Sequence, residues 1–354
     1  MERADKDLAF MLQYENIAWY DCGKVRILDR RIYPNKVQYV ECNTYTDVAN
    51  AISDMVTQSA GPYTAAAMGM ALAGNACKNL SYNKQIEYLK EASYTLSHAR
   101  PTTVDRMQYI TEGCLKHALT ALTNGEDVAQ SIVDYTVKIN NNRYNKIAKM
   151  ANFLVDTFPQ NGKILTQCFG ETIVGMMLRE AKRRHNELKI YCAETRPYFQ
   201  GARLTASVAC DMGFDVTVIT DNMPAYVIQK EKIDVFTSAA DVITADGHIV
   251  NKIGTFQIAI VCNYLGVPYY ATGAPDKGHP NIDNVVIENR NPDLVLEAMG
   301  VRTAMQGVKG YYPSFDITPP ELVKGIVTDC GIYTPQNLHT YYDNGNNGEY
   351  DIVI

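Results

Sequence analysis

Cys168 lies where a turn, a short apolar strand and a helix start meet in the sequence. Residues 159–162 contain turn formers, residues 163–166 predict a short strand, and residues 172–184 are rich in helix formers. We therefore expect Cys168 at the carboxyl end of a strand, the edge of an open α/β sheet where ligands bind. N–H groups at the helix start favour the thiolate, which makes Cys168 a candidate proton carrier near neutral pH. The alternative is a buried apolar cysteine without a chemical role.

Asp241 is the second residue whose setting suggests chemistry. It follows the small residues Ala239 and Ala240 at the end of another predicted strand. If this strand and the strand before Cys168 are neighbours, the carboxylate and the thiol share one pocket. Two titratable groups in a dry pocket can be driven to opposite protonation states, which acid–base isomerisation requires. The alternative is an aspartate that caps the next turn or helix.

The stretch from Asn251 to Thr255 combines an amide, an ammonium and a glycine, a set suited to hydroxyls and a phosphate. Lys252, Arg100 and Arg203 together are sufficient for a phosphate monoester, and the sequence has no Walker-type loop. Arg100 stands at a helix boundary, directly before a proline. A surface turn and a solvated arginine are the alternatives for these two sites.

Metal and disulfide chemistry find no support in the sequence. None of the six histidines has metal-ligand spacing with another, and the nine cysteines include no C-x-x-C pair and have an odd total. We therefore expect no metal site, no cofactor and no disulfide framework. His248, close to Asp246, is a further candidate pocket residue, with a solvated loop histidine as the alternative.

The composition of the 354 residues is that of a globular protein, with 46% hydrophobic and 20% charged residues and a net charge of -6. Basic runs interleaved with aromatic residues are absent, which argues against a nucleic-acid surface. No stretch approaches the roughly 18 apolar residues of a membrane span. We expect a soluble cytoplasmic protein that binds neither nucleic acid nor membrane.

The pattern of the chain changes near Phe158. Before it, three short strand-like pieces precede helical periodicity from Thr46 to about Thr157; after it, apolar runs alternate with helix-length segments, which predicts a parallel sheet covered by helices. The predicted strands after the change are residues 163–166, 188–192, 215–219, 235–237, 267–271 and 285–288. We expect domains at 1–157 and 158–340 and a polar tail at 341–354.

Several motifs together resemble one family. They are Cys168 after Ile-Leu-Thr, Glu-Thr-Arg-Pro-Tyr-Phe-Gln-Gly-Ala-Arg-Leu-Thr at 194–205, Ala-Ala-Asp at 239–241, Asn-Lys-Ile-Gly-Thr at 251–255 and Tyr-Pro-Ser-Phe-Asp-Ile-Thr-Pro at 312–319. Their order and spacing resemble the methylthioribose-1-phosphate isomerases, relatives of the regulatory subunits of translation initiation factor 2B. The resemblance extends to about residue 340.

The resemblance implies an α/β protein with a small N-terminal β-sheet and helical domain followed by a Rossmann-like parallel sheet covered by helices. It implies a cofactor-free aldose–ketose isomerase of methionine salvage, a homodimer, with Cys168 and Asp241 as the catalytic pair. An ungapped alignment from Asn251 places the catalytic aspartate on Asp241 and not on Asp246. The same carry-over gives a set of substrate-binding positions: Arg100, Gln200, Asn251, Lys252 and the loop residues Gln58, Ser59 and Ala60.

Three departures from the family pattern surround this implied site. The family's Arg-Gly-Ala-Pro-Ala-Ile-Gly loop is replaced by the shorter Gln58–Tyr63, which lacks the arginine. Its Cys-Asn-Ala-Gly becomes Cys168–Glu171, and its Asp-Arg-Ile becomes Asp241–Ile243. Two lost arginines and one added carboxylate change the charge of the pocket, so the identity of the sugar phosphate is open.

The leading hypothesis is an isomerase that opens a furanose 1-phosphate and moves hydrogen from C2 to C1, giving a ketose 1-phosphate. Asp241 is the candidate acid at the ring oxygen and Cys168 the candidate for proton transfer at carbon; whether the hydrogen moves as a proton or a hydride is open. The rival is a non-catalytic regulatory or nucleotide-sensing protein on the same scaffold. A third possibility is an isomerase of 5-deoxyribose 1-phosphate or ribose 1,5-bisphosphate.

Overall fold

The computed structural model describes residues 3–100 and 104–343. Two compact units divide the chain, Met1–Asn145 and Lys146–Ile354, and the division falls inside helix α6 (Val128–Val155). The domain boundary expected after Thr157 follows the end of this helix and stays a prediction. Most of the predicted polar tail, from residue 344 onward, lies outside the described residues.

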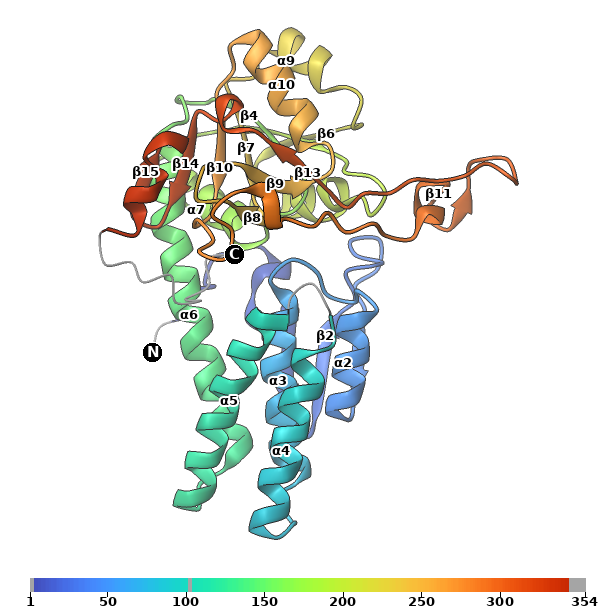
Figure 1. Ribbon diagram of the computed structural model, residues 1–354, viewed down its shortest axis with the longest axis vertical. Coiled ribbons are helices and arrows are strands. Elements are labelled where there is room, and N and C mark those ends of the chain that lie inside the picture. The colour runs from blue at the N-terminus through green and yellow to red at the C-terminus, as the bar shows by residue number, and fades with distance from the viewer. Residues whose placement is uncertain (1–2, 101–103, 344–354) are drawn as a thin grey trace. The chain divides into compact units, whose positions relative to one another are not determined.

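The first unit joins a small antiparallel sheet to a group of helices (Figure 1). Short helices η1 (Phe10–Leu12) and α1 (Tyr14–Ile17) precede strands β1 (Ala18–Asp21), β2 (Lys24–Leu28) and β3 (Tyr39–Cys42). The helices are α2 (Tyr45–Ser53), α3 (Gly61–Ala76), α4 (Tyr82–Ser97), α5 (Val104–Asn124) and the first part of α6. Helix α3 is buried along almost its whole length, because its small residues let β1, β2, α2, α4 and α5 all approach it.

The second unit is built on a seven-stranded sheet with the order β15-β14-β10-β7-β4-β5-β6. All neighbours are parallel except β14 and β15. The strands are β4 (Lys163–Thr166), β5 (Lys189–Ala193), β6 (Asp215–Ile219), β7 (Val235–Ala239), β10 (Tyr269–Thr272), β14 (Gly325–Thr328) and β15 (Gly331–Tyr333). Counted along the chain, the six parallel strands have the order 3-2-1-4-5-6, which is the doubly wound Rossmann order. The predicted α/β fold class is confirmed.

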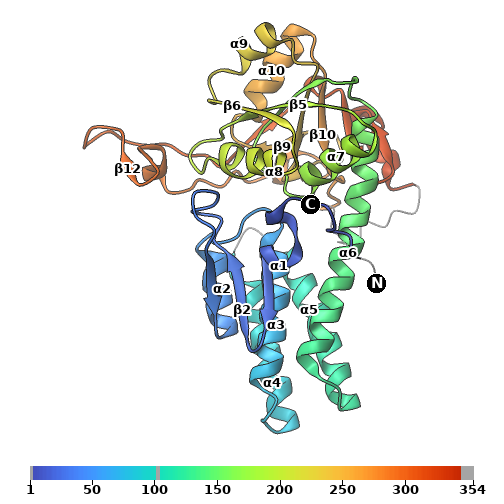
Figure 2. The same cartoon turned by 180° about the vertical axis from the view of Figure 1, so that it is seen from behind.

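Helices cover this sheet in two packed pairs, α7 with α8 and α9 with α10 (Figure 2). Their bounds are α7 (Thr172–Arg183), α8 (Ala206–Asp211), α9 (Pro224–Glu231) and α10 (Thr255–Leu265). A second sheet of three short antiparallel strands, β8 (Val242–Ile243), β9 (Ile249–Lys252) and β13 (Phe315–Thr318), carries the motif residues that follow β7. None of the helices in the described part of the chain is long and apolar enough to span a membrane.

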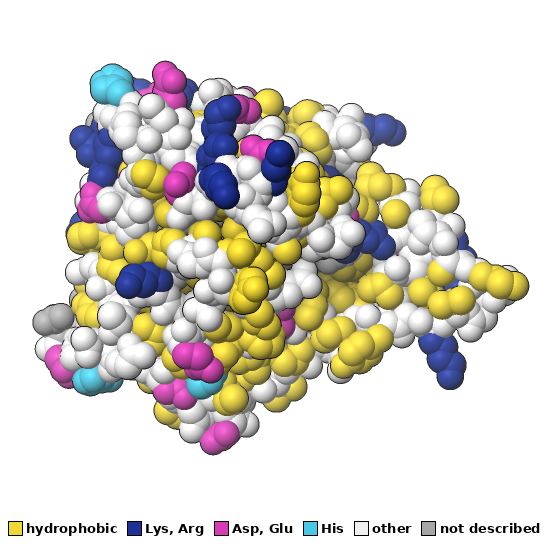
Figure 3. All heavy atoms as spheres, turned by 90° about the horizontal axis from the view of Figure 1, so that it is seen from above, with side chains coloured by type: hydrophobic (Ala, Val, Ile, Leu, Met, Phe, Trp, Pro, Cys, Tyr) yellow, Lys and Arg dark blue, Asp and Glu magenta, His cyan; other side chains and the backbone are white. Residues whose placement is uncertain are grey.

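The segment between β10 and β13 is largely irregular. It contains the helical turns η4 (Ile282–Asn284) and η5 (Pro292–Val295) and a hairpin of β11 (Glu297–Ala298) and β12 (Val301–Arg302), which extends away from the sheet in Figures 1 and 3. The hairpin and its flanks expose apolar side chains, including Met299, Val301, Met305 and Tyr311. Two further turns, η6 (Pro320–Leu322) and η7 (Pro335–Tyr341), flank β14 and β15.

One strand expectation is wrong. Residues 285–288 form no strand, although their apolar content resembles one. Val286 is 89% exposed, and the residue after this segment, Asn289, forms an isolated bridge with Pro313, where the proline has no N–H to extend a ladder. The sixth parallel strand is instead β14, which the sequence analysis did not predict.

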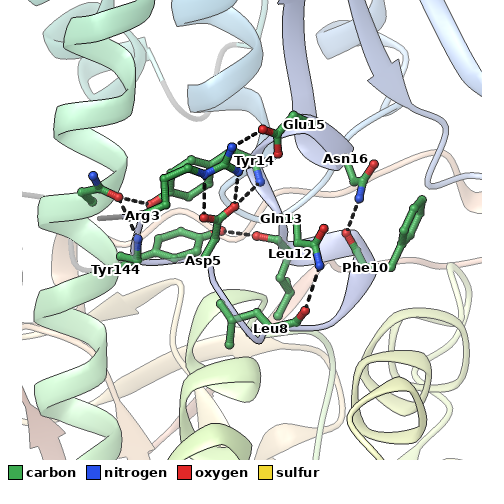
Figure 4. Close-up of polar contacts among 12 residues, drawn as sticks. Arg3, Asp5, Leu8, Phe10, Leu12, Gln13, Tyr14, Glu15, Asn16 and Tyr144 are labelled. Atoms are coloured by element: carbon green, nitrogen blue, oxygen red, sulfur yellow. Dashed lines mark hydrogen bonds and ion pairs between the residues drawn. The ribbon is translucent and has the colours of Figure 1, made fainter. Parts of the chain in front are cut away.

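Near the N-terminus of the first unit, a group of residues is linked by hydrogen bonds and ion pairs (Figure 4). Arg3 forms ion pairs with Asp5 and Glu15, and its guanidinium lies 4.8 Å from the ring of Tyr14. Asp5 also accepts the backbone N–H of Tyr14 at 2.8 Å, and Tyr144 of α6 donates its hydroxyl to the carbonyl of Leu12 at 2.9 Å. This cluster joins the first residues of the chain to α1 and α6.

Candidate active site

The topology places Cys168 and Asp241 at one point of the sheet. Cys168 follows β4 by two residues and Asp241 follows β7 by two residues, and these strands are parallel neighbours. The chain leaves β4 toward β5 on one side and β7 toward β10 on the other, so the two residues flank the topological switch point. Crevices at such switch points are where open α/β sheets bind ligands. The condition on which their proximity depended, that the two strands are neighbours, is confirmed.

The turn that carries Cys168 has an unusual backbone. Cys168 has φ of 63° and Glu171 has φ of 36°, conformations that cost non-glycine residues about 1–3 kcal/mol each. Two hydroxyls hold the turn: Cys168 donates its N–H to Thr195 Oγ1 at 3.0 Å, and Thr205 donates its hydroxyl to the carbonyl of Cys168. A Cβ atom on Gly170 would lie 3.0 Å from Cβ of Ala239. The turn after β4 therefore touches the end of β7.

Gln200, a predicted substrate-binding residue, makes a direct contact to the thiol. The Cys168 thiol donates to Gln200 Oε1 at an Sγ–Oε1 distance of 3.4 Å, and the Gln200 side chain is buried. A π-helical turn, η3 (Gly201–Thr205), begins directly after Gln200. A Cβ atom on Gly201 would lie 1.8 Å from the carbonyl oxygen of Ala193, so only glycine fits this approach. Single π-turns of this kind are frequent at functional sites.

Burial raises the pKa of the Cys168 thiol to about 11, and the nearby Asp241 carboxylate adds to this effect. The cations of Lys252 and Arg290 oppose the increase but do not cancel it. The expectation that helix-start N–H groups favour the thiolate is therefore wrong, because the dry surroundings of the sulfur outweigh them. Near neutral pH the Cys168 thiol is therefore protonated, so it is better able to donate a proton than to accept one.

Lys252 is the buried cation of the site. It ends β9, opposite Phe315 of β13, and its Nζ lies 4.8 Å from the centre of the Phe315 ring. Burial lowers its pKa, repulsion from Arg290 acts in the same direction, and the nearby Cys168 and Asp241 groups oppose both. Of the residues that the structure describes, none forms an ion pair with Lys252. A partly uncompensated ammonium in a crevice is suited to an anionic ligand.

Asn251, the neighbour of Lys252, is also buried in β9 and not in a surface turn. Its amide Nδ2 donates to Thr255 Oγ1 at 3.0 Å. Across the same strand pair, Asp316 accepts the N–H groups of Gly254 and Phe256 at 2.7 and 3.2 Å and so caps the start of α10. Burial raises the pKa of Asp316 to about 6 despite these two hydrogen bonds.

Arg290 and the aromatic residues around it, which lie near the thiol, were not predicted as functional. Arg290 lies 5.9 Å from the rings of Tyr198 and Phe315 and forms an ion pair with Glu288 at 3.2 Å. Tyr312 is buried; burial raises its pKa, and the groups that act on it include Arg290 and Cys168. Two of these residues, Tyr312 and Phe315, belong to the family motif at 312–319. Nothing in the sequence distinguished Arg290, which lies on irregular backbone just after residues 285–288, the segment expected to be a strand.

Asp246, the alternative to Asp241, is engaged within its own loop. Hydrogen bonds from Thr244 and His248 lower its pKa, although partial burial acts in the opposite direction, and its carboxylate lies 2.9 Å from His248 Nδ1. His248, a candidate pocket residue, is therefore paired with Asp246. In the described part of the chain no group of three His, Cys, Asp or Glu side chains could hold a metal ion, and none of the nine cysteines forms a disulfide.

The remaining predicted binding residues belong to the first unit. Gln58 and Ala60 are buried directly before α3, and Ser59 has φ of 58°. Arg30, which the sequence analysis did not select, is fully buried and donates Nη1 to the carbonyl of Gln58 at 2.8 Å. A guanidinium thus contacts the loop that lacks the family's arginine. Arg100 follows α4 and is partly buried; its part in binding, like that of the loop, stays a prediction.

Comparison with known proteins defines the class. Residues 58–335 match the model of the initiation factor 2 subunit family, IF-2B. Methylthioribose-1-phosphate isomerase 1 of Pseudothermotoga lettingae is 35% identical over 320 residues, 87% of this chain and 92% of that protein. A 5-deoxyribose 1-phosphate isomerase of Clostridium botulinum, strain Loch Maree, is 36% identical over 349 residues, 92% of this chain and 98% of that protein.

Solved structures agree with these relatives. The 5-methylthioribose 1-phosphate isomerase of Pyrococcus horikoshii OT3 superimposes with a TM-score of 0.83 at 28% identity, covering 93% of this chain and 96% of that chain. The delta subunit of translation initiation factor eIF-2B from A. fulgidus gives 0.79 at 28% identity, covering 90% and 96%. The chain therefore belongs to the initiation factor 2 subunit family. Within it, the chain is an isomerase of the group formed by the methylthioribose-1-phosphate and 5-deoxyribose 1-phosphate isomerases.

Proposed function

We propose that the protein converts a 5-substituted ribose 1-phosphate to the corresponding ribulose 1-phosphate, and that 5-deoxyribose 1-phosphate is its preferred substrate. The observation that carries the proposal is the position of Cys168 and Asp241 after neighbouring parallel strands at the switch point, with the buried Lys252 beside them. The relatives support the reaction type, and they divide between the two sugar phosphates at nearly equal identity.

In the proposed reaction, Asp241 donates a proton to the ring oxygen, which breaks the C1–O bond and leaves C1 electron-poor. Hydrogen moves from C2 to C1, and the C2 hydroxyl returns its proton to Asp241 as the C2 carbonyl forms, so that protons balance. Because the Cys168 thiol is protonated, it is a weak base at C2. We infer that the hydrogen moves directly, with the thiol as an uncharged neighbour. A substrate deuterated at C2 should keep the label at C1; loss of the label to solvent would contradict direct transfer.

The choice of sugar rests on the altered loop. In the family, the loop corresponding to Gln58–Tyr63 carries an arginine, and replacing a charge-assisted contact by a neutral one is worth about 1.5–3 kcal/mol, or roughly tenfold to a hundredfold in affinity. Glu171, a buried residue at the start of α7, adds a carboxylate where the family has glycine. Both changes argue for a ligand other than methylthioribose 1-phosphate.

The test is kcat/KM on a panel of 5-deoxyribose 1-phosphate, methylthioribose 1-phosphate and ribose 1,5-bisphosphate. We expect 5-deoxyribose 1-phosphate to be favoured over methylthioribose 1-phosphate by about tenfold or more. Turnover of methylthioribose 1-phosphate at about 10⁴ M⁻¹s⁻¹ or above would contradict the retuned pocket. Absence of turnover on the whole panel would favour the regulatory alternative, which the similarity to the initiation-factor subunit keeps open.

The loop can be tested by reverting it. Gln58→Arg combined with Glu171→Gly should move the preference back toward methylthioribose 1-phosphate. Since Arg30 is buried against this loop, Arg30→Gln is added as a third substitution in a second variant, so that two buried guanidinium groups do not repel each other. We expect the largest shift in the triple variant. An unchanged preference in both variants would show that the loop does not select the sugar.

We also propose a homodimer formed through the second unit. The edge strand β6 and the helices α9 and α10 expose apolar side chains that include Val218, Tyr226, Ile260 and Tyr264, and hydrophobic surface is extensive in Figure 3. Tyr264→Glu should convert the dimer to a monomer in light scattering. Tyr94→Glu, at a comparably exposed tyrosine in α4, is the matched control. A monomeric unmodified protein would contradict the dimer.

A further inference from the structure

The loop Thr195–Gln200, between β5 and η3, contacts Cys168 at both of its ends. Thr195 Oγ1 accepts the Cys168 N–H at 3.0 Å, and Gln200 Oε1 accepts from the thiol at 3.4 Å. The backbone position of the cysteine and the orientation of its sulfur therefore both depend on where this loop lies.

The loop does not rest in a relaxed conformation. Thr195 has φ of 64° and Phe199 has φ of 54°, and the left-handed region is particularly unfavourable for a β-branched residue such as Thr195. Strain of this kind persists only where the surrounding structure holds it. The contacts that hold the loop are therefore part of the site's construction.

Two groups hold it from different directions. The Asp221 carboxylate, after β6, accepts the backbone N–H groups of Thr195 and Arg196 at 2.8 and 2.6 Å. The guanidinium of Arg196 reaches the segment between η5 and β11. Its Nη2 lies 2.6 Å from the carbonyl oxygen of Glu297 and 3.4 Å from those of Leu294 and Val295.

The geometry of Arg196 suits this task. Its guanidinium also lies 4.8 Å from the ring centre of Phe199, within the same loop. A planar group with five donors can bridge several carbonyl oxygens at once, which a lysine ammonium at the same place cannot reproduce in full. The same irregular segment supplies Arg290, whose guanidinium lies 5.9 Å from the ring of Tyr198. The loop thus contacts residues 290–297 at two positions, Arg196 and Tyr198.

We propose that Arg196 is a positioning residue of the isomerisation, which fastens the Thr195–Gln200 loop to residues 294–297 and thereby sets the place of Gln200 and Cys168. The part of this proposal that concerns the reaction rests on the proposed function. The part that concerns the position of the loop does not. Arg196 acts through its neighbours and has no chemical step of its own.

The test compares Arg196→Met and Arg196→Lys with Arg302→Met. Arg302 is a matched control because it also donates to backbone carbonyls of the same irregular segment, those of Ala304 and Met305, but lies outside the contacts to the loop. The first readout is the rate at which iodoacetamide alkylates Cys168 at pH 9, followed by peptide mass spectrometry, with the exposed Cys210 and Cys330 as internal references. The second is kcat on 5-deoxyribose 1-phosphate.

For Arg196→Met we expect Cys168 alkylation to rise and kcat to fall, each by about tenfold, because the thiol loses its Gln200 partner and its fixed place. Arg196→Lys should be intermediate and Arg302→Met unchanged. Thermal melting followed by circular dichroism shows whether the variants are folded at the assay temperature. If Arg196→Met is unfolded, Arg196→Lys takes its place in the comparison. Unchanged alkylation in folded Arg196→Met, or an equal rise in Arg302→Met, would overturn the proposal.

The two readouts separate this proposal from the proposed function. If no sugar phosphate is turned over but Arg196→Met exposes Cys168, the function fails and the positioning of the loop stands. If turnover by Arg196→Met is normal although Cys168 is exposed, the function stands and a role for Arg196 in the reaction is overturned.

Discussion

The N-terminal cluster and the Cys168 site both gather charged side chains, but they treat charge differently. In the cluster, Arg3 is paired with Asp5 and Glu15, and the pKa of Glu15 is lowered by its hydrogen bond to Arg3, even though partial burial opposes the shift. In the site, burial raises the pKa of Cys168 and lowers that of Lys252, so the charged form of each group is disfavoured relative to water. In the cluster, ion pairs neutralise the charged side chains, whereas in the site the described residues form no ion pair with the Lys252 ammonium.

This difference separates a structural role from a chemical one. A paired cluster stabilises the fold and gains nothing from a ligand, because its charges already have partners. A buried ammonium next to a backbone held at positive φ costs stability. Groups kept in this state are suited to bind an anion and move a proton. The comparison therefore predicts that substitutions in the two regions have opposite consequences for activity and stability.

The largest effect is expected at the catalytic pair. Asp241→Asn should lower kcat by about a hundredfold or more while the protein remains folded, the scale of a lost general acid or base. Cys168→Ser should lower kcat by about tenfold, because the hydroxyl is smaller and more polar than the uncharged thiol beside the moving hydrogen. Steady-state kinetics on the preferred sugar phosphate measure this.

The matched control for the pair is Asp246→Asn. The Asp246 carboxylate is held by Thr244 and His248 and has no place in the proposed reaction, so its activity should stay near that of the unmodified protein. Loss of activity in Asp246→Asn together with normal activity in Asp241→Asn would show that the wrong aspartate has been assigned.

The second effect sets Lys252→Met against Arg3→Met. Lys252→Met should lower kcat/KM by about tenfold or more, because an anion loses a buried cation, and should leave the free energy of unfolding unchanged or higher. Arg3→Met should lower the free energy of unfolding by about 1–3 kcal/mol, because it leaves the buried Asp5 without its cation, and should leave activity unchanged. Denaturant unfolding and kinetics on both variants measure the contrast. The comparison fails if both variants lose stability to a similar extent.

The smallest effect concerns Asp316, whose pKa burial raises to about 6 from an ordinary value of 3.8. Between these values the folded state binds more protons than the unfolded state, so this contribution to stability is complete below pH 3.8 and is lost as pH rises through about 6. The stability of the unmodified protein relative to Asp316→Asn should therefore fall between pH 4 and pH 7, by on the order of 1–2 kcal/mol. Unfolding curves of both proteins at these pH values provide the test, and a relative stability that grows with pH would contradict it.

The sequence predicted what local signals encode. Residues 163–166 form β4 at the predicted positions because turn formers bound a short apolar run, and Cys168 follows the strand as expected. That β4 and β7 are neighbours was only a condition in the sequence analysis, because strand order depends on how crossovers close around the whole sheet. The homologous relatives identify the family, yet the roles of the individual site residues stay predictions.

What the sequence could not provide is long-range burial. The thiolate was expected from the adjacent helix start, but the pKa of Cys168 is raised by burial and by the charge of Asp241, which lies on another loop of the sheet. The contacts of Arg196 and Arg290 could not be predicted for the same reason, since their partners lie in other segments or on irregular backbone without periodicity. Patterns of period 2 or 3.6 carry no information about such contacts.

The most direct test of the account is the pH dependence of Cys168 alkylation, measured peptide by peptide from pH 7 to pH 12 in the unmodified protein, with the exposed Cys210 as internal reference. The account predicts a midpoint of about 11 for Cys168, because burial raises the pKa of its thiol. A Cys168 midpoint at or below the ordinary thiol value of 9.0 would contradict a neutral thiol at the centre of this site.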